Sequence, residues 1–380
     1  TNLAFLRGIN VTGSNKCLQM QLKIKHVSEK ENSHIIFATG TPIVNSITDM
    51  FVMQKYLVPE LLNTLGLDSF DSWIGLFGEL SSDFEIDVDV NQYKQVTRFS
   101  KFHNLKCLSL LINQFTDFYS ASEDNLPNVK ENETIKLLKT PIQTELINKV
   151  SIRVDDIRKN KVSRKEDNLL KITTDGRKLA LDPRLINENY EREENNKIER
   201  CGENIYQIYL NNQDKAQIVF SDIGTPKDKF NVYDALKLYL LDKGLSIEQI
   251  QYVHDATTDE KREELFDRVR KGIVKVLIGS TFKLGIGVNV QDHLIALHHL
   301  DVPWRPSDMI QREGRILRQG NENENVYIYR YVTEGTFDAY LWQILETKQR
   351  FISQLLSGCV AISNYEDLSE NILTYGEVKA

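Results

Sequence analysis

Strands and helices alternate along residues 206–335, and this alternation restricts the possible folds more than any other feature of the chain. Short apolar runs beside turn residues predict strands, and apolar residues three or four positions apart predict helices. The predicted order is strand AQIVFSDI, helix YDALKLYLLDKG, strand IQYVHDA, helix TDEKREELFDRVRKG, strand VKVLIGS, strand HLIALHHLDV, an arginine-rich helix and strand VYIYRYV. Such alternation favours a parallel sheet with right-handed crossovers and helices on both faces. We therefore expect one α/β domain over residues 206–335.

Two further regions have recognisable patterns. HIIFATGTPI (34–43) predicts a short buried strand that leads into a turn, and NSITDMFVMQKYL (45–57) predicts the helix after it. Residues 61–125 mix aromatic and basic residues, and residues 143–200 are highly charged. A charged run of this kind is typical of a solvated helix or a linker, and we expect helices there.

The composition limits the class of protein. With 380 residues, 41% of them hydrophobic, the chain is long enough for two or three domains of roughly 150 residues each. The net charge of −7 and the pI near 5.7 exclude a protein covered in positive charge. Any contact with nucleic acid must therefore come from local basic patches.

The cysteines and the apolar runs give expectations about compartment. The four cysteines have no Cys-x-x-Cys spacing, which argues against a disulfide scaffold or a zinc site and favours a reducing compartment, so we expect a cytoplasmic protein. No segment approaches the roughly 18–20 apolar residues of a membrane span. The first residues, TNLAFLRGIN, include no initiator Met and no signal-peptide pattern, which predicts a fragment of a longer protein. The cysteines are Cys17, Cys107, Cys201 and Cys359.

The segment QREGRILRQG (311–320) gathers three arginines, two glutamines and two glycines. On a helix, Gln311, Arg315 and Arg318 lie at i, i+4 and i+7 and share one face. Gly314 has no Cβ and lets a ligand approach the backbone closely. The alternative is a solvated basic helix face with no ligand.

In open α/β sheets, ligands bind beyond the carboxyl ends of the strands. The segment STFKLGIGVNVQ (280–291) follows the strand VKVLIGS, and the arginine-rich segment follows HLIALHHLDV, so both are expected at that edge. Gly285 and Gly287 permit close approach of a ligand, and the polar residues here offer uncharged hydrogen bonds. Those polar residues are Ser280, Thr281 and Asn289.

Several segments occur in the order and at the spacings of the C-terminal portion of superfamily 2 helicases, and the chain resembles Swi/Snf-type DNA translocases. In particular it is similar to the helicase-like proteins of bacterial and phage mobile elements. The segments are ATGTPIVN (38–45), QIVFSD (217–222), STFKLGIGVNVQ (280–291), DVPWRPSDMIQREGRILRQG (301–320) and EGTFDAYLWQILETK (334–348).

The resemblance implies two RecA-like lobes of the P-loop NTPase type, with ATP in the cleft between them, and a complete second lobe here. The expected parts are the end of the first lobe with the coupling motif (1–60), a helical protrusion (61–125), a return segment to the first lobe (126–142), a second helical insertion or linker (143–205), the second lobe (206–335) and a helical brace (336–380).

Roles follow from the same resemblance. Arg315 and Arg318 are expected to be arginine fingers that reach the γ-phosphate of ATP, with Gln311 in support; an arginine fork suits the charge that phosphoryl transfer spreads over oxygens. The other expected roles fall into three groups. The coupling motif is Thr39, Gly40, Thr41, Pro42 and Asn45. The nucleotide-binding candidates are Gly287, Asn289 and Gly314. The DNA-binding candidates are Ser280, Thr281, Arg98, Lys101 and Arg177.

The sequence departs from the family at two motifs. Superfamily 2 activity requires a GxGKT phosphate loop and a DExH box for Mg²⁺, yet the chain contains no Gly-Lys dipeptide, no D-E-x-H and no D-E-x-D. Both motifs normally precede the coupling motif. We therefore expect the upstream ATPase lobe of the same protein to supply the binding groups for ATP and Mg²⁺, and we expect these 380 residues alone not to hydrolyse ATP.

The expected partners and setting also come from the resemblance. They are the DNA backbone, contacted without sequence specificity and in a salt-dependent way, and a methyltransferase domain or restriction–modification partner. The setting is a bacterial or phage-encoded protein associated with the nucleoid, with no membrane.

Two other functions fit parts of the sequence. DVPWRP resembles the D-P-P-W box of amino-methyltransferases, but Val302 replaces the first proline and no FxGxG cofactor loop is present. A half-motor without its ATPase lobe would act as a DNA- or protein-binding adaptor. The pair His254 and Asp255 is typical of a structural strand end, and the adjacent His298 and His299 lie on opposite faces of a strand, so no protein-only metal site is expected.

Overall fold

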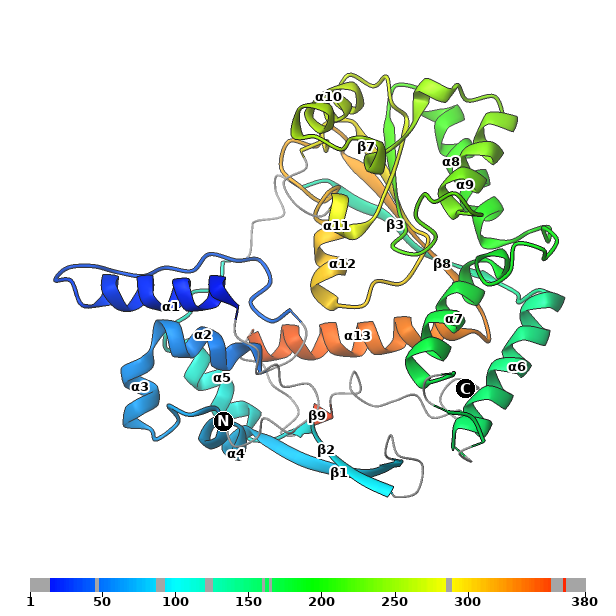
Figure 1. The fold of residues 1–380 in the computed structure, drawn as a ribbon. Helices are drawn as coiled ribbons and strands as arrows, with labels where there is room; N and C mark the ends of the chain where they lie inside the picture. The colour runs from blue at the N-terminus through cyan, green and yellow to red at the C-terminus, as the bar shows by residue number, and fades with distance from the viewer. Residues whose placement is uncertain are drawn as a thin grey trace. The chain divides into compact units, whose positions relative to one another are not determined.

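The computed structural model describes residues 14–44, 48–86, 93–119, 126–158, 161–163, 166–284, 289–356 and 365–366. The chain divides into two compact units, the first formed by residues 1–120 and 344–372 and the second by residues 121–343 and 373–380. Each unit has its own hydrophobic core and is described separately (Figure 1).

The second unit is built on a six-stranded sheet with the order β3–β8–β7–β4–β6–β5, in which every neighbouring pair is parallel. The strands are β3 (Asn128–Leu137), β4 (Ala216–Phe220), β5 (Ile250–Tyr252), β6 (Val276–Gly279), β7 (Leu294–His299) and β8 (Asn325–Thr333). The helices are α6 (Pro141–Arg158), α7 (Leu169–Leu181), α8 (Lys197–Asn211), α9 (Val232–Asp242), α10 (Asp259–Arg270), α11 (Thr281–Leu284) and α12 (Pro306–Glu313).

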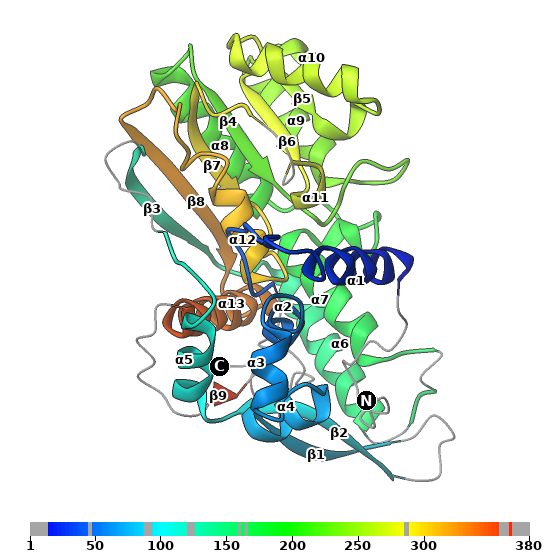
Figure 2. The ribbon, with the colours of Figure 1, turned by 90° about the vertical axis from the view of Figure 1, so that its left-hand side faces the viewer.

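Helices cover both faces of this sheet (Figure 2). Because successive side chains of a strand point to opposite faces, Val219 of β4 joins the core formed with α8 and α9, whereas Ile218 joins the core formed with α10 and α11. Side-chain caps fix where the helices begin: Asn231 accepts a hydrogen bond from the backbone N–H of Asp234 at the start of α9. The predicted RecA-like α/β fold with a parallel sheet is confirmed.

The boundaries of this unit differ from the predicted ones. Residues 126–142 were expected to return to the first lobe, but residues 128–137 form β3 and pair along β8 at the edge of the second unit's sheet. The polar pattern of an edge strand does not reveal which sheet it joins, because it has few buried side chains of its own. The unit also begins before residue 206, since Ile198 and Cys201 of α8 are buried in its core.

The first unit is mostly helical. Its core surrounds Trp73, whose indole N–H donates to Oε1 of the buried Gln54 at 2.7 Å. Phe51 and Phe77 pack against that ring. The elements are α1 (Asn15–Ser28), α2 (Asp49–Leu57), α3 (Pro59–Thr64), α4 (Phe70–Phe77), β1 (Gly78–Ile86), β2 (Tyr93–Phe102), α5 (Leu105–Asn113) and β9 (Tyr365–Glu366).

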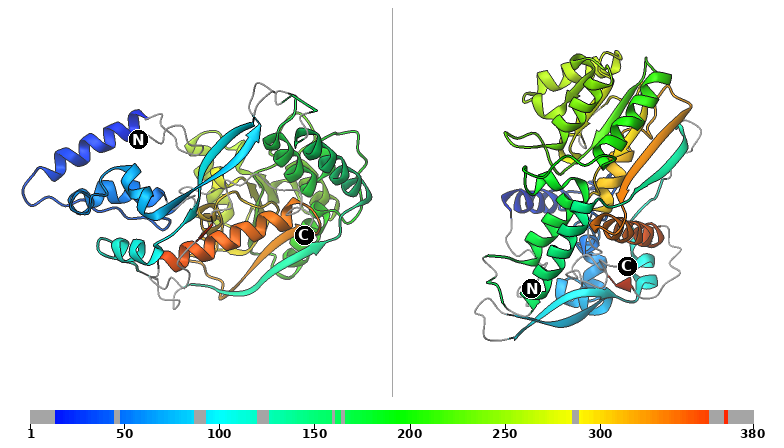
Figure 3. Two further views of the ribbon diagram at one scale, coloured as in Figure 1. Left: turned by 90° about the horizontal axis from the view of Figure 1, so that it is seen from below. Right: turned by 90° about the vertical axis from the view of Figure 1, so that its right-hand side faces the viewer.

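Two expectations for the first unit need correction. Residues 61–125, predicted to be helical, contain the antiparallel β1–β2 hairpin, drawn in cyan in Figure 3, between α4 and α5. Its sequence alternates polar and apolar residues, as in DFEI (83–86), which is the period of a strand. HIIFATGTPI (34–43) forms no strand, and Ile36 is 85% exposed. A strand needs a neighbour for its N–H and C=O groups, and the described part of the first unit provides none beside it.

Helix α13 (Phe337–Leu356) begins in the second unit and ends in the first. At its end, Leu355 is buried in the core of the first unit, and the Ser109 hydroxyl donates to the Leu355 carbonyl at 3.1 Å. Helices α6 and α7 pack together within residues 143–205, the predicted helical insertion. No helix in the described ranges is long and apolar enough to cross a membrane.

Candidate functional site

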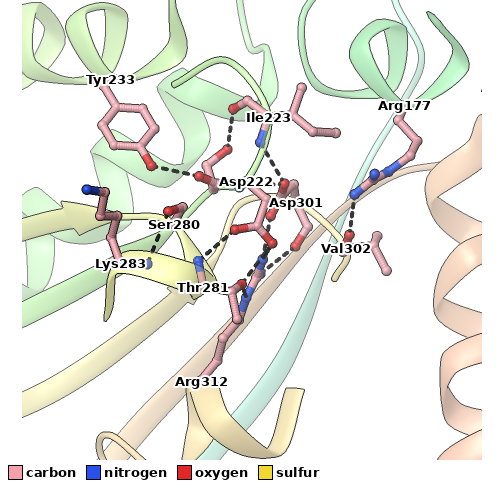
Figure 4. Close-up of polar contacts among 11 residues, drawn as sticks. Arg177, Asp222, Ile223, Tyr233, Ser280, Thr281, Lys283, Asp301, Val302 and Arg312 are labelled. Atoms are coloured by element: carbon pink, nitrogen blue, oxygen red, sulfur yellow. Dashed lines mark hydrogen bonds and ion pairs between the residues drawn. The ribbon is translucent and has the colours of Figure 1, made fainter. Parts of the chain in front are cut away.

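Three polar side chains lie at one edge of the second unit's sheet. Asp222, Thr281 and Asp301 each come two residues after the last residue of a strand, namely β4, β6 and β7. Since these strands are parallel neighbours, their carboxyl ends bring the three side chains together (Figure 4).

Arg312, in the last turn of α12, enters this group and is fully buried. Its Nε donates to the Thr281 hydroxyl at 2.7 Å, and its Nη1 donates to the Asp301 carbonyl at 3.0 Å. Its Nη2 donates to Asp222 Oδ2 at 2.6 Å and to Asp301 Oδ1 at 3.0 Å. Asp222, Thr281, Asp301 and Arg312 thus form one connected cluster, called the strand-end network below.

The two carboxylates of the network also bind backbone groups. Asp301 Oδ2 accepts from the N–H of Asp222 at 2.7 Å and of Ile223 at 3.1 Å. Asp222 accepts from the Thr281 N–H at 2.6 Å and from its hydroxyl at 2.8 Å. These bonds fix the turns after β4 and β6 against each other, so the carboxyl ends of the strands are held in one arrangement.

Burial and neighbouring charges shift the pKa values of the charged groups in this network in opposite directions. Burial raises the pKa of Asp222, but the charge of Arg312 and the hydrogen bonds from Thr281 outweigh it, so the pKa lies below its usual value. The pKa of Asp301 is raised, because its complete burial outweighs the attraction of Arg312. Burial lowers the pKa of Arg312, but the two carboxylates more than offset that effect and raise it.

Gln311, Arg315 and Arg318 do not share one helix. Helix α12 ends at Glu313, Gly314 is its C-cap, and residues 314–320, called the arginine turn below, form a series of turns. Gly314 weakens the helix at this point, since glycine has the lowest helix propensity after proline. The predicted shared helical face is therefore wrong.

The arginine turn nevertheless joins two of the three residues. Arg315 Nε donates to the Gln311 carbonyl at 3.3 Å. Burial lowers the pKa of Arg315, and the positive charge of Arg318 lowers it further. The buried Ile316 anchors the turn in the core, and Asn321 Nδ2 donates to the Ile316 carbonyl at 3.0 Å. The Arg315 N–H donates to the Arg312 carbonyl at 3.1 Å, so the turn is joined to the strand-end network through its backbone.

The other predicted ligand residues near the sheet edge have different surroundings. The Thr281 hydroxyl is engaged inside the protein, and the buried Ser280 accepts a hydrogen bond from the Lys283 N–H at 3.4 Å. Asn289 is exposed, and its carbonyl accepts from Arg270 at 2.9 Å. Gly287 lies outside the described residues.

Arg177, predicted to contact DNA, contacts the DVPW segment of its own unit. Its Nη2 donates to the Val302 carbonyl at 2.9 Å, and its guanidinium lies over the Trp304 ring at 4.8 Å from the centroid. Arg98 and Lys101 are in β2, and their side chains lie outside the described part of the structure. The structure therefore does not bring these three basic residues together in one unit.

The coupling-motif residues lie in the first unit between α1 and α2. The Thr39 hydroxyl accepts from the Thr41 N–H at 3.1 Å, which closes a tight turn at Gly40. Thr39 and Gly40 are exposed, and Pro42 is half-buried. Asn45 lies outside the described residues. The two hydroxyl-bearing residues thus belong to one turn.

The histidines do not form a metal site. His298 contacts the Tyr331 hydroxyl at 2.9 Å and Gln217 Oε1 at 3.0 Å, whereas His299 stacks on Phe220 on the other side of β7. Burial lowers the pKa of His298 to about 3 and that of His299 to about 4. Among the residues that the structure describes, no group of three His, Cys, Asp or Glu side chains could hold a metal ion.

Arg312, Asp222 and Asp301 were not predicted as site residues from the sequence. A usable signal was present, because the polar residues at 222, 281 and 301 all lie at the carboxyl ends of three predicted strands. Arg312 has no comparable signal, since a charged side chain at a helix end is usually exposed.

Two family models match parts of the chain. Residues 3–120 match the family "Probable helicase domain", and residues 196–320 match "Helicase conserved C-terminal domain". The second match contains the strand-end network and the arginine turn.

Among curated relatives, Defense against restriction protein B of Escherichia phage P1 is 35% identical over 20% of this chain and 3% of that protein. The uncharacterized ATP-dependent helicase YqhH of Bacillus subtilis is 31% identical over 27% of this chain and 19% of that protein. The SWI/SNF-related matrix-associated actin-dependent regulator of chromatin subfamily A member 1 of Mus musculus is 23% identical over 86% of this chain and 29% of that protein. The chain thus spans less than a third of each.

Among solved structures, the C-terminal part of the Fun30 ATPase domain aligns with a TM-score of 0.45 and 15% identity, covering 61% of this chain and 99% of that chain. The family matches and the remodeller alignment, which covers 86% of this chain, point the same way. Residues 196–320 match a helicase conserved C-terminal domain, and the chain is similar to the C-terminal portion of Swi/Snf-type superfamily 2 helicases.

Proposed function

We propose that the chain is the C-terminal part of an ATP-dependent DNA translocase, in which Arg315 and Arg318 act as arginine fingers on ATP held mainly by another lobe. The observation that carries this proposal is the place of the arginine turn, which directly follows α12 within the match to "Helicase conserved C-terminal domain" and is joined to the strand-end network, because the Arg315 N–H donates to the Arg312 carbonyl at 3.1 Å. The triphosphate of ATP is an anion that guanidinium groups bind well.

The chemistry of phosphoryl transfer suits this arrangement. Negative charge spreads over the equatorial oxygens in the transition state, and a guanidinium provides a planar fork for two oxygens. Gln311 supports the pair through its carbonyl contact with Arg315. Gly314 and Asn289 are proposed to lie beside the nucleotide, together with Gly287. ATP arrives with Mg²⁺, which neutralises charge on its phosphates.

The groups that would hold Mg²⁺ and the β- and γ-phosphates are proposed to belong to a preceding ATPase lobe. Neither a GxGKT nor a DExH sequence occurs in the chain. The first unit also has apolar groups that a further layer would cover, because Ile36 is 85% exposed and α1 exposes three apolar side chains. These are Leu18, Met20 and Leu22. The chain alone is therefore proposed to lack ATPase activity.

The DNA contacts are proposed to be to the phosphate backbone, through Ser280 at the carboxyl end of β6 and basic side chains including Arg98, Lys101 and Arg177. Such contacts carry no sequence information and weaken steeply with salt. The tight turn at Thr39, Gly40, Thr41 and Pro42, with Asn45, is proposed to link the nucleotide site to the DNA. The name of the phage P1 relative supports a restriction-related setting for this chain. A methyltransferase domain or a restriction–modification protein is the partner proposed for that setting.

The test is DNA-stimulated ATPase activity of the complete reading frame beside this chain alone. We expect activity only in the complete protein, and a loss of roughly 10³ to 10⁵ in kcat for Arg315→Ala or Arg318→Ala with ATP still bound. Arg200→Ala, which removes an exposed arginine from α8 of the same unit, serves as the matched control and should retain activity. An inactive complete protein, or active finger variants, would reject the motor and favour a half-motor adaptor that binds DNA or protein.

A further inference from the structure

Thr281 was expected to contact DNA, yet its side chain is turned into the protein. Its hydroxyl donates to Asp222 Oδ2 at 2.8 Å and accepts from Arg312 Nε at 2.7 Å, and the residue is only 7% exposed. A hydroxyl has one proton to donate, and here that proton is committed to a carboxylate. Both interactions involve a charged partner, and such hydrogen bonds are the stronger kind.

The partner of this hydroxyl connects it with the arginine turn. Arg312 lies three residues before Arg315, and the Arg315 N–H donates to the Arg312 carbonyl at 3.1 Å. The Arg312 side chain reaches the ends of β4, β6 and β7 through Asp222, Thr281 and Asp301 (Figure 4). The start of α11, beside the proposed DNA contact at Ser280, is therefore tied to the turn that carries the proposed fingers.

We propose that Thr281 and Arg312 are positioning residues that transmit DNA contact at the end of β6 to Arg315 and Arg318. This inference rests on the proposed function. The Thr281 hydroxyl acts within the protein and does not bind the DNA phosphate. A shift of the backbone at Ser280 and Thr281 moves the group that Arg312 Nε binds, and Arg312 moves the arginine turn.

The charges make this link stiff. Arg312 is the guanidinium that both Asp222 and Asp301 contact, and it is fully buried. Moving Arg312 away from either carboxylate would break an ion pair of a fully buried guanidinium, which is strongly unfavourable. The network therefore moves as one body or stays in place, and small backbone shifts at the end of β6 reach the arginine turn without being absorbed by side-chain motion.

The experiment separates positioning from DNA contact in the complete protein. Thr281→Val removes the hydroxyl and keeps the shape, and Thr281→Ser keeps the hydroxyl. We expect Thr281→Val to lower kcat at saturating DNA by about tenfold or more, the effect of losing a charge-assisted hydrogen bond, with the half-saturating DNA concentration unchanged. Thr281→Ser should restore kcat.

The matched control is Thr333→Val, which removes another buried threonine hydroxyl of the same unit, bonded to the Ala180 carbonyl at 3.0 Å. It should keep kcat at saturating DNA. Asp222→Asn is the second variant, which weakens the same network from another strand and should show the same selective loss of kcat if Thr281→Val does not fold.

Three results would overturn the inference. A higher half-saturating DNA concentration with normal kcat in Thr281→Val would show that its hydroxyl binds DNA. An equal loss in Thr333→Val would show a merely structural effect. A complete wild-type protein without DNA-stimulated ATPase activity would reject the proposed function and this inference together, whereas the first two results reject the inference alone.

Discussion

The strand-end network and the arginine turn are neighbours in sequence, but they treat positive charge in opposite ways. Arg312 is fully buried between two carboxylates, which raise its pKa despite burial. Arg315 lies beside another arginine, and burial together with that neighbour lowers its pKa. Carboxylates around a buried guanidinium stabilise one arrangement of the fold, whereas a like charge nearby opposes the protonated form of Arg315. The same residue type thus has a structural role at one position and a proposed catalytic role three residues later.

The largest expected effect on stability is that of Arg312→Ala. The substitution removes the buried guanidinium that pairs with both Asp222 and Asp301, which should reduce the free energy of unfolding by about 3–5 kcal/mol. Urea unfolding, followed by hydrogen exchange of the β4 and β7 amides, would measure the loss in the second unit. A loss below about 1 kcal/mol would mean that Arg312 does not hold the strand ends, and the contrast with Arg315 would disappear.

The second prediction concerns pH and the buried histidines next to the network. Burial lowers the folded-state pKa of His298 to about 3 and of His299 to about 4. Below about pH 6.5 these histidines bind protons in the unfolded chain but not in the folded state. Their contribution to the free energy of unfolding therefore falls as the pH decreases and is constant above neutrality. Between pH 6.5 and pH 5, each histidine should reduce the free energy of unfolding by about 2 kcal/mol.

His298→Gln tests this assignment through the slope and not through absolute stability. The slope of the unfolding free energy against pH gives the number of protons taken up on unfolding, and this number should decrease by about one between pH 5 and pH 6. His34→Gln, which changes an exposed histidine, is the matched control measured beside it. An unchanged slope in His298→Gln would show that this histidine is protonated in the folded state.

Much of the second unit's fold could be predicted from the sequence. Its central strands are continuous apolar runs such as IVF (218–220) and VLIG (276–279), which only a sheet covered on both faces can bury. The edge strand β3 could not be assigned, because its pattern VKENETIKL does not show which sheet provides its neighbour. HIIFATGTPI has the composition of a buried strand, but forming one depends on a partner strand outside this segment.

The candidate site was predictable only in part. The residue types Gln311, Arg315 and Arg318 were recognisable, and the arginine turn keeps them together although the helix ends at Glu313. The role of Arg312 was hidden, because its burial depends on carboxylates that are 11 and 90 residues away in sequence. Helical periodicity predicts which residues share a face of one helix, whereas the residues of the strand-end network come from four separate segments of the chain.

A smaller effect is expected where the two regions join, at Gly314. Its φ of −65° is open to any residue, so Gly314→Ala should raise the free energy of unfolding by reducing the conformational entropy of the unfolded chain. A Cβ would lie 3.0 Å from the Ile310 carbonyl oxygen, which opposes that gain. We expect a change in unfolding free energy within about 1 kcal/mol. In the complete protein the variant should raise the KM for ATP if the nucleotide approaches this backbone, and an unchanged KM would contradict that approach.

The smallest effect on stability is expected for Arg315→Ala, the counterpart of Arg312→Ala. Losing a guanidinium whose pKa is lowered by burial and by Arg318 removes an unfavourable interaction along with the contact to the Gln311 carbonyl. Because the strand-end carboxylates pair with Arg312, the unfolding free energy should change far less in Arg315→Ala than in Arg312→Ala, by about 0.5 kcal/mol. Denaturant unfolding would measure it beside Arg312→Ala under the same conditions. A loss similar to that of Arg312→Ala would make Arg315 a structural residue. It would also remove the physical basis for its role as a finger, since a finger must be held in place and still be able to bind the phosphate of ATP.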